Sequence, residues 1–123
     1  MAYDYKKAFS VEGKKCIVTG GAQGLSRGMA EALLENGAAV VLMDVQKEKL
    51  ETVTEEYRAM GYEAYCVSGD LSKKEEIDRM FEEAMKLLEG RLDVLIPAAG
   101  IQRRYEPWEF PKEMWDLVIN VNL

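Results

Sequence analysis

The stretch from Thr19 to Ser26 holds the residues whose types and spacing are best suited to bind a ligand. Its glycines Gly20 and Gly24 can adopt backbone angles closed to other residues and let a bound group approach the main chain. An apolar run precedes the stretch and a helical pattern follows it, and free N–H groups at a helix start favour anions. These properties suit a nucleotide pyrophosphate, although a tight strand-to-helix connection would also need such glycines.

A carboxylate follows the second apolar run. Asp44 comes twenty residues after Gly24, a position from which a carboxylate can accept hydrogen bonds from an adenosine ribose 2′-OH. The same charge would repel a 2′-phosphate, so this residue favours NAD over NADP. The other interpretation is that Asp44 only starts the next helix, where acidic residues are also favoured.

Strands and helices that alternate along the chain are expected to position these residues. Four apolar runs predict strands, and they are Cys16–Val18, Ala38–Met43, Ala64–Val67 and Leu92–Ile96. Helical spacing of apolar residues between the runs predicts helices, three of which stop at a glycine: Gly37, Gly61 and Gly90. A loop from Ile101 to Phe110 follows, and Pro111 suits the first position of a last helix.

The spacing also predicts which helix residues are buried. In the first helix after the glycine turn, the expected buried face is Leu25, Met29 and Leu33. In the second it is Leu50, Val53, Tyr57 and Met60, and in the third it is Ile77, Met80, Phe81, Ala84, Met85 and Leu88. The third helix is expected to begin with a capping box formed by Ser72 and Glu75.

Strict alternation of strand and helix predicts an α/β fold, with a parallel sheet covered on both faces. Right-handed crossovers with a reversal after the third strand give the order 3-2-1-4, the first half of a doubly wound, Rossmann-type sheet. We expect one truncated domain over residues 1–123, in which the glycine turn and Pro97–Gly100 line one crevice. Cys16 and Cys66 then lie two strands apart, about 9–10 Å, too far for a disulfide.

Composition narrows the classes of function. The net charge of −6 argues against broad electrostatic binding to nucleic acid or anionic lipid. The sequence has no histidine and two cysteines, so we expect no transition-metal site of the usual kind. We find neither a membrane-spanning run nor the apolar core of a signal peptide, and we expect a cytoplasmic protein.

In order along the chain, these features resemble the classical short-chain dehydrogenase/reductase family. The family pattern Thr-Gly-x-x-x-Gly-x-Gly is matched at Thr19, Gly20 and Gly24, but its last glycine is Ser26 here. The serine could crowd the helix or offer a phosphate a hydrogen bond. The resemblance implies that the turn binds the cofactor through Gly20, Gln23, Gly24, Leu25 and Ser26.

The resemblance extends to two further segments of the expected cofactor site. Asp70 and Leu71 look like the family's adenine-contacting pair, although Asp70 could instead be a loop residue ahead of Ser72. The family's Asn-Asn-Ala-Gly after the fourth strand is here Pro97-Ala98-Ala99-Gly100, so both asparagines are absent. Ala99 and Gly100 would still allow close backbone approach to a nicotinamide ribose.

The loop after the fourth strand looks particularly like the gluconate 5-dehydrogenase and ketogluconate reductase branch. It contains Arg103 and Arg104, and the resemblance implies a sugar-acid substrate. An arginine can hold a carboxylate with two hydrogen bonds. The other interpretation is a solvated pair that faces Glu106 and Glu109.

In the last predicted helix, Asn122 matches the family's asparagine of the proton relay, with Asn120 as a competing candidate. The family's catalytic serine, tyrosine and lysine would fall beyond Leu123. We therefore expect the cofactor-binding, N-terminal part of an NAD-dependent oxidoreductase for a sugar acid or ketone, which alone turns over no substrate. The alternative is a non-catalytic nucleotide-binding or protein-interaction module. We also expect a homo-oligomer, formed through the exposed fourth strand or the last helix.

Overall fold

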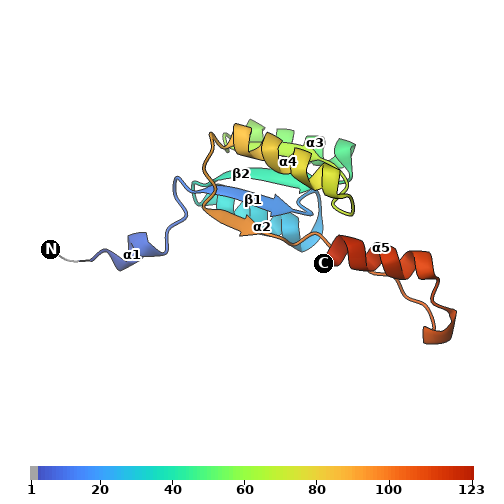
Figure 1. Ribbon diagram of the computed structural model, residues 1–123. Helices are drawn as coiled ribbons and strands as arrows, with labels where there is room; N and C mark the ends of the chain where they lie inside the picture. The colour runs from blue at the N-terminus through green and yellow to red at the C-terminus, as the bar shows by residue number, and fades with distance from the viewer. Residues whose placement is uncertain (1–2) are drawn as a thin grey trace.

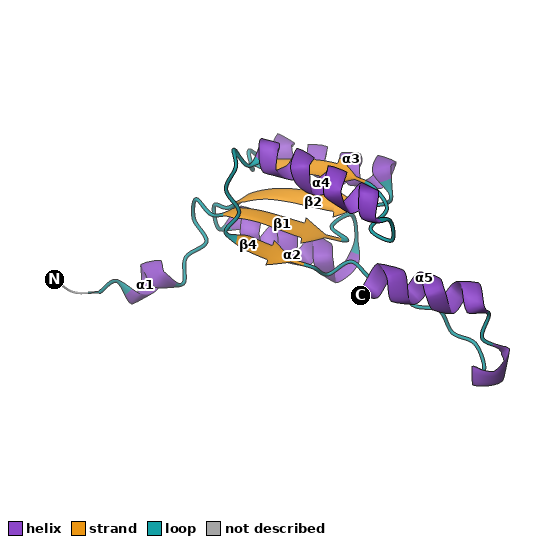
Figure 2. Cartoon of the chain, in the orientation of Figure 1, coloured by secondary structure: helices purple, strands orange, loops and turns teal. Residues whose placement is uncertain are grey.

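The computed structural model describes residues 3–123 and confirms a Rossmann-type α/β fold (Figure 1). Its strands are β1 (Lys15–Thr19), β2 (Ala39–Asp44), β3 (Ala64–Ser68) and β4 (Val94–Ile96). Its helices are α1 (Tyr5–Ala8), α2 (Gly24–Glu35), α3 (Lys47–Ala59), α4 (Lys74–Leu87) and α5 (Lys112–Asn122), with a short 3₁₀ turn, η1, at Pro107–Glu109. Figure 2 shows strands and helices alternating along the chain, as the sequence predicts.

The four strands are parallel and lie in the order β3-β2-β1-β4, which confirms the predicted order. At the centre, Cys16 of β1 lies beside Val40 of β2 on one side and Val94 of β4 on the other. Chain reversal after β3 places β1 and β4 next to each other. Their carboxyl ends therefore form the switch point at which doubly wound sheets bind ligands.

Helices cover both faces of the sheet and form two apolar cores. On one face α2 and α3 pack through residues such as Leu34, Leu50 and Tyr57. On the other face α4 contributes Met80 and Ala84. The strand β2 is buried along its whole length, because helices cover both of its faces.

The predicted buried face of α2 is wrong by one residue. The side chains that α2 buries are Ser26, Ala30 and Leu34, whereas Leu25 is 84% exposed, Met29 is exposed and Leu33 is half-buried. Small residues at positions 26 and 30 let the helix lie close to the sheet, and this close approach selects the face. Met29 and Leu33 lie instead beside Ile96 of β4 in a surface groove.

The two following helices expose some of the residues that helical spacing predicts to be buried. Met60 is the C-cap of α3 and is 65% exposed. On α4, Ile77 and Phe81 are exposed and Met85 is half-buried, whereas Met80, Ala84 and the C-cap residue Leu88 are buried. The predicted capping box is also wrong, because Lys73 is the N-cap and Ser72 donates its hydroxyl hydrogen to Asp70 instead.

Both cysteines are free thiols, as the strand order predicts. Cys16 is buried in β1, and Cys66 lies half-buried on β3 beyond the intervening β2. Burial, with a smaller contribution from the charge of Asp93, raises the pKa of Cys16 to about 11. The Cys16 thiol is therefore a protonated packing group at neutral pH.

The last helix, α5, extends beyond the carboxyl ends of the strands, on the side opposite α1 (Figure 1). Pro111 was predicted to be the first residue of this helix, but it is the N-cap, and the helix begins at Lys112. None of its residues is fully buried. Within residues 3–123, no helix has the length and apolar character needed to cross a membrane.

Candidate functional site

A cavity of about 510 Å³ opens at the carboxyl end of the sheet, a volume suited to a cofactor-sized ligand. Segments far apart in the sequence meet in it: the turn after β1, the ends of β2 and β3, the loop after β4, and α5. Among its lining residues are Gly20, Gln23, Gly24, Ser26, Asp44, Asp70, Leu71, Ala99, Gly100 and Arg103. Most residues predicted to bind a cofactor are therefore brought together in one place.

The glycine turn forms one wall of the cavity. Gly20 has φ +71°, and a Cβ atom there would lie 3.1 Å from Cα of Ala99. Both its conformation and its contact therefore require glycine. Gln23, the N-cap of α2, makes no capping hydrogen bond with its side chain, so the first amides of the helix remain available to an anion.

Asp44 is buried at the end of β2 and lines the cavity. Its Oδ2 accepts a hydrogen bond from the amide of Ala22 at 3.1 Å, and its Oδ1 accepts one from the amide of Gln46 at 3.0 Å. Gln46, and not Asp44, is the N-cap of α3. The carboxylate thus braces the glycine turn, and each oxygen retains a further acceptor site.

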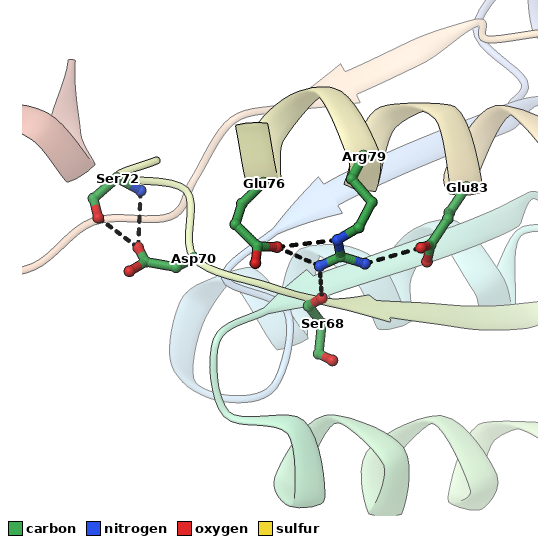
Figure 3. Close-up of polar contacts among 6 residues, drawn as sticks. All are labelled: Ser68, Asp70, Ser72, Glu76, Arg79 and Glu83. Atoms are coloured by element: carbon green, nitrogen blue, oxygen red, sulfur yellow. Dashed lines mark hydrogen bonds and ion pairs between the residues drawn. The ribbon is translucent and has the colours of Figure 1, made fainter. Parts of the chain in front are cut away.

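Asp70 lies in the turn after β3, which also lines the cavity. Its Oδ1 accepts hydrogen bonds from the Ser72 hydroxyl at 2.7 Å and the Ser72 amide at 2.9 Å (Figure 3). These bonds, chiefly the one from the hydroxyl, hold the pKa of Asp70 below its usual value. The side chain is therefore charged at neutral pH and fixes the shape of its own turn.

Hydrogen bonds join the two sides of the crevice between β1 and β4. The amide of Ala99 donates to the hydroxyl of Thr19 at 2.9 Å. The Ser26 hydroxyl lies 3.5 Å from the Ala98 carbonyl oxygen, a long and weak contact. Ser26, which stands where the family pattern has glycine, is accommodated at the start of α2 with its hydroxyl turned toward the segment that lacks the family's asparagines.

The structure separates the two arginines of the loop after β4. Arg103 lines the cavity, whereas Arg104 does not. Asn122 does not line it either, and its side-chain amide instead holds the backbone of Ile101: Oδ1 accepts from the Ile101 amide at 2.9 Å, and Nδ2 donates to the Ile101 carbonyl at 3.0 Å. Leu25, predicted with the turn, likewise lies outside the lining.

Several residues of the site were not predicted. Gly69 follows β3, and the other lining residues that were not predicted are Val45, Gln46, Ile101, Leu117 and Val121. The hydrogen bond by which Thr19 bridges the crevice was not predicted either. The position directly after a predicted parallel strand is the signal that could have identified Gly69 and Val45. The contribution of α5 had no comparable signal, because it depends on how the loop after β4 folds back.

A tyrosine and a lysine at the spacing Tyr-x-x-x-Lys occur at Tyr3 and Lys7. Both are exposed, and neither lines the cavity. Lys7 belongs to α1, which lies at the opposite end of the sheet from α5 (Figure 1). This pair therefore does not provide a general acid/base at the cavity.

The sequence matches a known family over most of its length. The model of the short chain dehydrogenase family matches residues 14–123. The 5-keto-D-gluconate 5-reductase of Escherichia coli K12 is 38% identical over 114 residues, covering 93% of this chain and 44% of that relative. The 2-dehydro-3-deoxy-D-gluconate 5-dehydrogenase of the same organism is 36% identical over 116 residues, covering 94% and 45%. The chain thus spans under half the length of these curated relatives.

Solved structures agree in fold. A short chain dehydrogenase/reductase from Burkholderia phymatum, in complex with NAD, superposes with a TM-score of 0.88 at 29% identity, covering 94% of this chain and 41% of that one. A gluconate 5-dehydrogenase from Burkholderia cenocepacia, in complex with NADP and tartrate, gives 0.83 at 30% identity, covering 94% and 45%. From the site geometry and these matches together, we conclude that the chain belongs to the short chain dehydrogenase family.

Proposed function

We propose that this chain is the cofactor-binding part of an NAD-dependent oxidoreductase that acts on a secondary alcohol or ketone. The observation that carries the proposal is the cavity shared by the glycine turn, Asp44, Asp70 and the loop after β4. In that arrangement the amides at the start of α2 bind the pyrophosphate. Asp44 accepts from the adenosine ribose, and Asp70 with Leu71 lies against the adenine.

A bound nicotinamide supplies hydride transfer, and the protein's part is to bind and orient the reacting groups. Ala99 and Gly100 carry no side chain beyond Cβ, so the backbone there can approach the nicotinamide ribose closely. Asn122 fixes the backbone of Ile101 next to this segment. Its family role in the proton relay is part of the proposal, with Asn120 as the competing candidate.

NAD is the cofactor that we favour over NADP. The carboxylate of Asp44 lines the cavity and would lie against a 2′-phosphate. Repulsion between two negative charges in a partly buried site is stronger than in water. Relatives of known structure hold either NAD or NADP, so the preference rests on Asp44.

The proposed substrate is a sugar acid such as gluconate. Relatives are named as a 5-keto-D-gluconate 5-reductase and a gluconate 5-dehydrogenase. Arg103 lines the cavity and offers a guanidinium to a substrate carboxylate, whereas Arg104 lies outside the lining. We therefore assign substrate contact to Arg103 before Arg104. Among residues 3–123, none that lines the cavity is a tyrosine, and we propose that this chain alone turns over no substrate.

A second candidate function is a non-catalytic nucleotide-binding or protein-interaction module. The observation that favours it is the sequence Pro97-Ala98 in place of the family's two asparagines. Without these side-chain amides, the crevice beside β4 is held by the Thr19 hydroxyl and the weak contact of Ser26. Such a module would bind nucleotide weakly or would bind only a protein partner.

Titration of the 123-residue chain with NADH and with NADPH tests the proposed function. We expect saturable binding of NADH at concentrations below about 1 mM and weaker binding of NADPH. Lack of saturable NADH binding would favour the second candidate. Tighter binding of NADPH than of NADH would contradict the role assigned to Asp44.

We further propose that the chain self-associates through β4 or α5. Within residues 3–123, β4 pairs on one side only, with β1. Leu95 in its middle is 54% exposed, and an unpaired apolar strand promotes pairing with another chain. Sedimentation at high protein concentration should show dimers or larger species, and Leu95→Lys should reduce them. A single monomeric species for the unsubstituted chain would refute this proposal.

A further inference from the structure

Arg79 of α4 makes a branched set of contacts at the carboxyl end of β3 (Figure 3). Its Nη2 donates a hydrogen bond to the backbone carbonyl of Ser68, the last residue of β3, at 2.8 Å. Its Nε donates to Glu76 at 3.1 Å, and Nη2 also contacts that carboxylate. Its Nη1 donates to Glu83 at 2.9 Å. All three guanidinium nitrogens are therefore engaged.

Glu76 aims the guanidinium at the strand, because it binds Nε and Nη2, the nitrogen that reaches Ser68, whereas Glu83 binds Nη1. Glu76 and Glu83 lie three residues before and four residues after Arg79, so all three side chains share one face of α4. Their hydrogen bonds, that of Glu76 foremost, raise the pKa of Arg79. The planar fork can serve two carboxylates and a carbonyl at once, which a lysine ammonium cannot match in geometry.

The residue after Ser68 is held between α4 and β2. A Cβ atom on Gly69 would lie 2.5 Å from Sδ of Met80 and 2.8 Å from Nη2 of Arg79, so the helix packs directly on this backbone. On the other side, the Gly69 amide donates to the carbonyl oxygen of Asp44 at 3.1 Å. The chain leaving β3 is thus fixed by hydrogen bonds to two different elements.

This fixed point leads into the cavity. Gly69, Asp70 and Leu71 all line it, and Asp44 links the same region to the glycine turn through the amide of Ala22. A continuous chain of contacts therefore runs from α4, through the ends of β3 and β2, to the turn that follows β1. Arg79 is the outermost member of this chain of contacts and lies outside the family pattern Thr-Gly-x-x-x-Gly-x-Gly.

We infer that Arg79 is a positioning residue for the adenosine end of the cofactor site. By tying α4 to the carbonyl of Ser68, it holds the backbone of Gly69–Leu71 at the distance from Asp44 that the nucleotide requires. The inference rests on the proposed function, since it assigns the adenosine to this part of the cavity. Arg79 itself lies outside the cavity lining, so it would act on the nucleotide only through the backbone that it holds.

The variants Arg79→Met, Arg79→Lys and Glu83→Gln separate this role from general stabilisation of α4. Arg79→Met removes the contact with Ser68 and should weaken NADH binding about tenfold. Glu83→Gln removes one ion pair but leaves the Ser68 contact, so its affinity should stay within about twofold of the original chain. The lysine of Arg79→Lys can bind only one of the three partners of Arg79 at a time, so its NADH affinity should fall between those of Arg79→Met and the original chain. All affinities are measured at a temperature well below the thermal unfolding midpoint of each variant.

Amide hydrogen exchange gives a readout that does not need the cofactor. In Arg79→Met, protection of the Gly69 amide should fall relative to that of Val40 in β2, whose amide donates to the backbone carbonyl of Glu63 at 2.9 Å. A purely structural role for Arg79 would lower the protection of α4 but would leave Gly69 and NADH affinity unchanged.

The outcomes distinguish this inference from the proposed function. If the unsubstituted chain binds NADH and Arg79→Met binds it equally well, the inference is wrong and the proposed function stands. If the unsubstituted chain does not bind NADH, both the proposed function and the cofactor role of Arg79 fail. Weaker binding by Arg79→Met together with lower protection of Gly69 would support the inference.

Discussion

Replacing Gly20 with alanine is expected to lower the free energy of unfolding by about 2–4 kcal/mol and to weaken NADH binding about tenfold or more. Two costs add at this position. An alanine at φ +71° is strained, and its Cβ would lie 3.1 Å from Cα of Ala99 and 3.3 Å from Oγ of Ser26. The backbone of Ala99 cannot move away without opening the crevice between β1 and β4. Thermal or urea unfolding and NADH titration measure the two effects.

Gly13 offers a matched control for the strain alone. Its φ is +74°, and a Cβ there would meet no atom within 4 Å. Gly13→Ala should therefore cost only about 1–2 kcal/mol of stability and leave NADH affinity unchanged. If Gly20→Ala and Gly13→Ala had equal effects on both measurements, the close approach of the turn to Ala99 would have no functional importance.

Replacing Asp44 with asparagine is expected to shift the ratio of NADH to NADPH affinity toward NADPH by about tenfold or more. Asparagine has nearly the same shape but carries no charge, so the repulsion of a 2′-phosphate is removed. It can accept only one of the two backbone hydrogen bonds that Asp44 accepts, from Ala22 and Gln46. The variant should therefore also lose about 1–2 kcal/mol of stability.

Asp70→Asn is the matched control for this second prediction. Asp70 lines the same cavity, but it lies in the turn assigned to the adenine. Its replacement should change the affinities for NADH and NADPH by a similar factor, leaving their ratio within about twofold of the original. An unchanged ratio in Asp44→Asn would show that the carboxylate does not face the ribose.

The sheet was predictable because its signals are local and strong. Continuous apolar runs ending at Thr19 and Asp44 identify buried parallel strands, and alternation with helices leaves few possible connections. The order β3-β2-β1-β4 follows from those rules and matches the structure. The free state of both cysteines follows from the same order.

The faces and caps of the helices were harder to predict, because they depend on competition between similar residues. Leu25 and Met29 have the helical spacing of a buried face, yet α2 buries Ser26 and Ala30, whose small size permits closer packing on the sheet. Ser72 stands where a capping residue is expected, but its hydroxyl donates a hydrogen bond to Asp70 instead. Periodicity alone does not decide between such alternatives.

The candidate site was predictable where the sequence shows a strand end, whereas individual hydrogen bonds between distant segments were missed. Gly20, Asp44 and Asp70 each lie at or just after the carboxyl end of a strand and line the cavity. The bond between Thr19 and Ala99 joins residues that are eighty positions apart. Likewise, the contact of Arg79 with Ser68 depends on how α4 crosses the sheet. These contacts require the packed structure.

The most direct test of the central claim is an NMR titration of the ¹⁵N-labelled chain with NAD⁺. If the cavity at the carboxyl end of the sheet is the cofactor site, NAD⁺ should change the amide chemical shifts of Gly20, Gly24 and Gly69 most. These changes should reach a plateau as NAD⁺ is added. The surface groove beside Phe9 and Met29 should remain unaffected. A cofactor site in this cavity would be contradicted if those three glycine amides did not shift, or if the largest shifts fell in that groove.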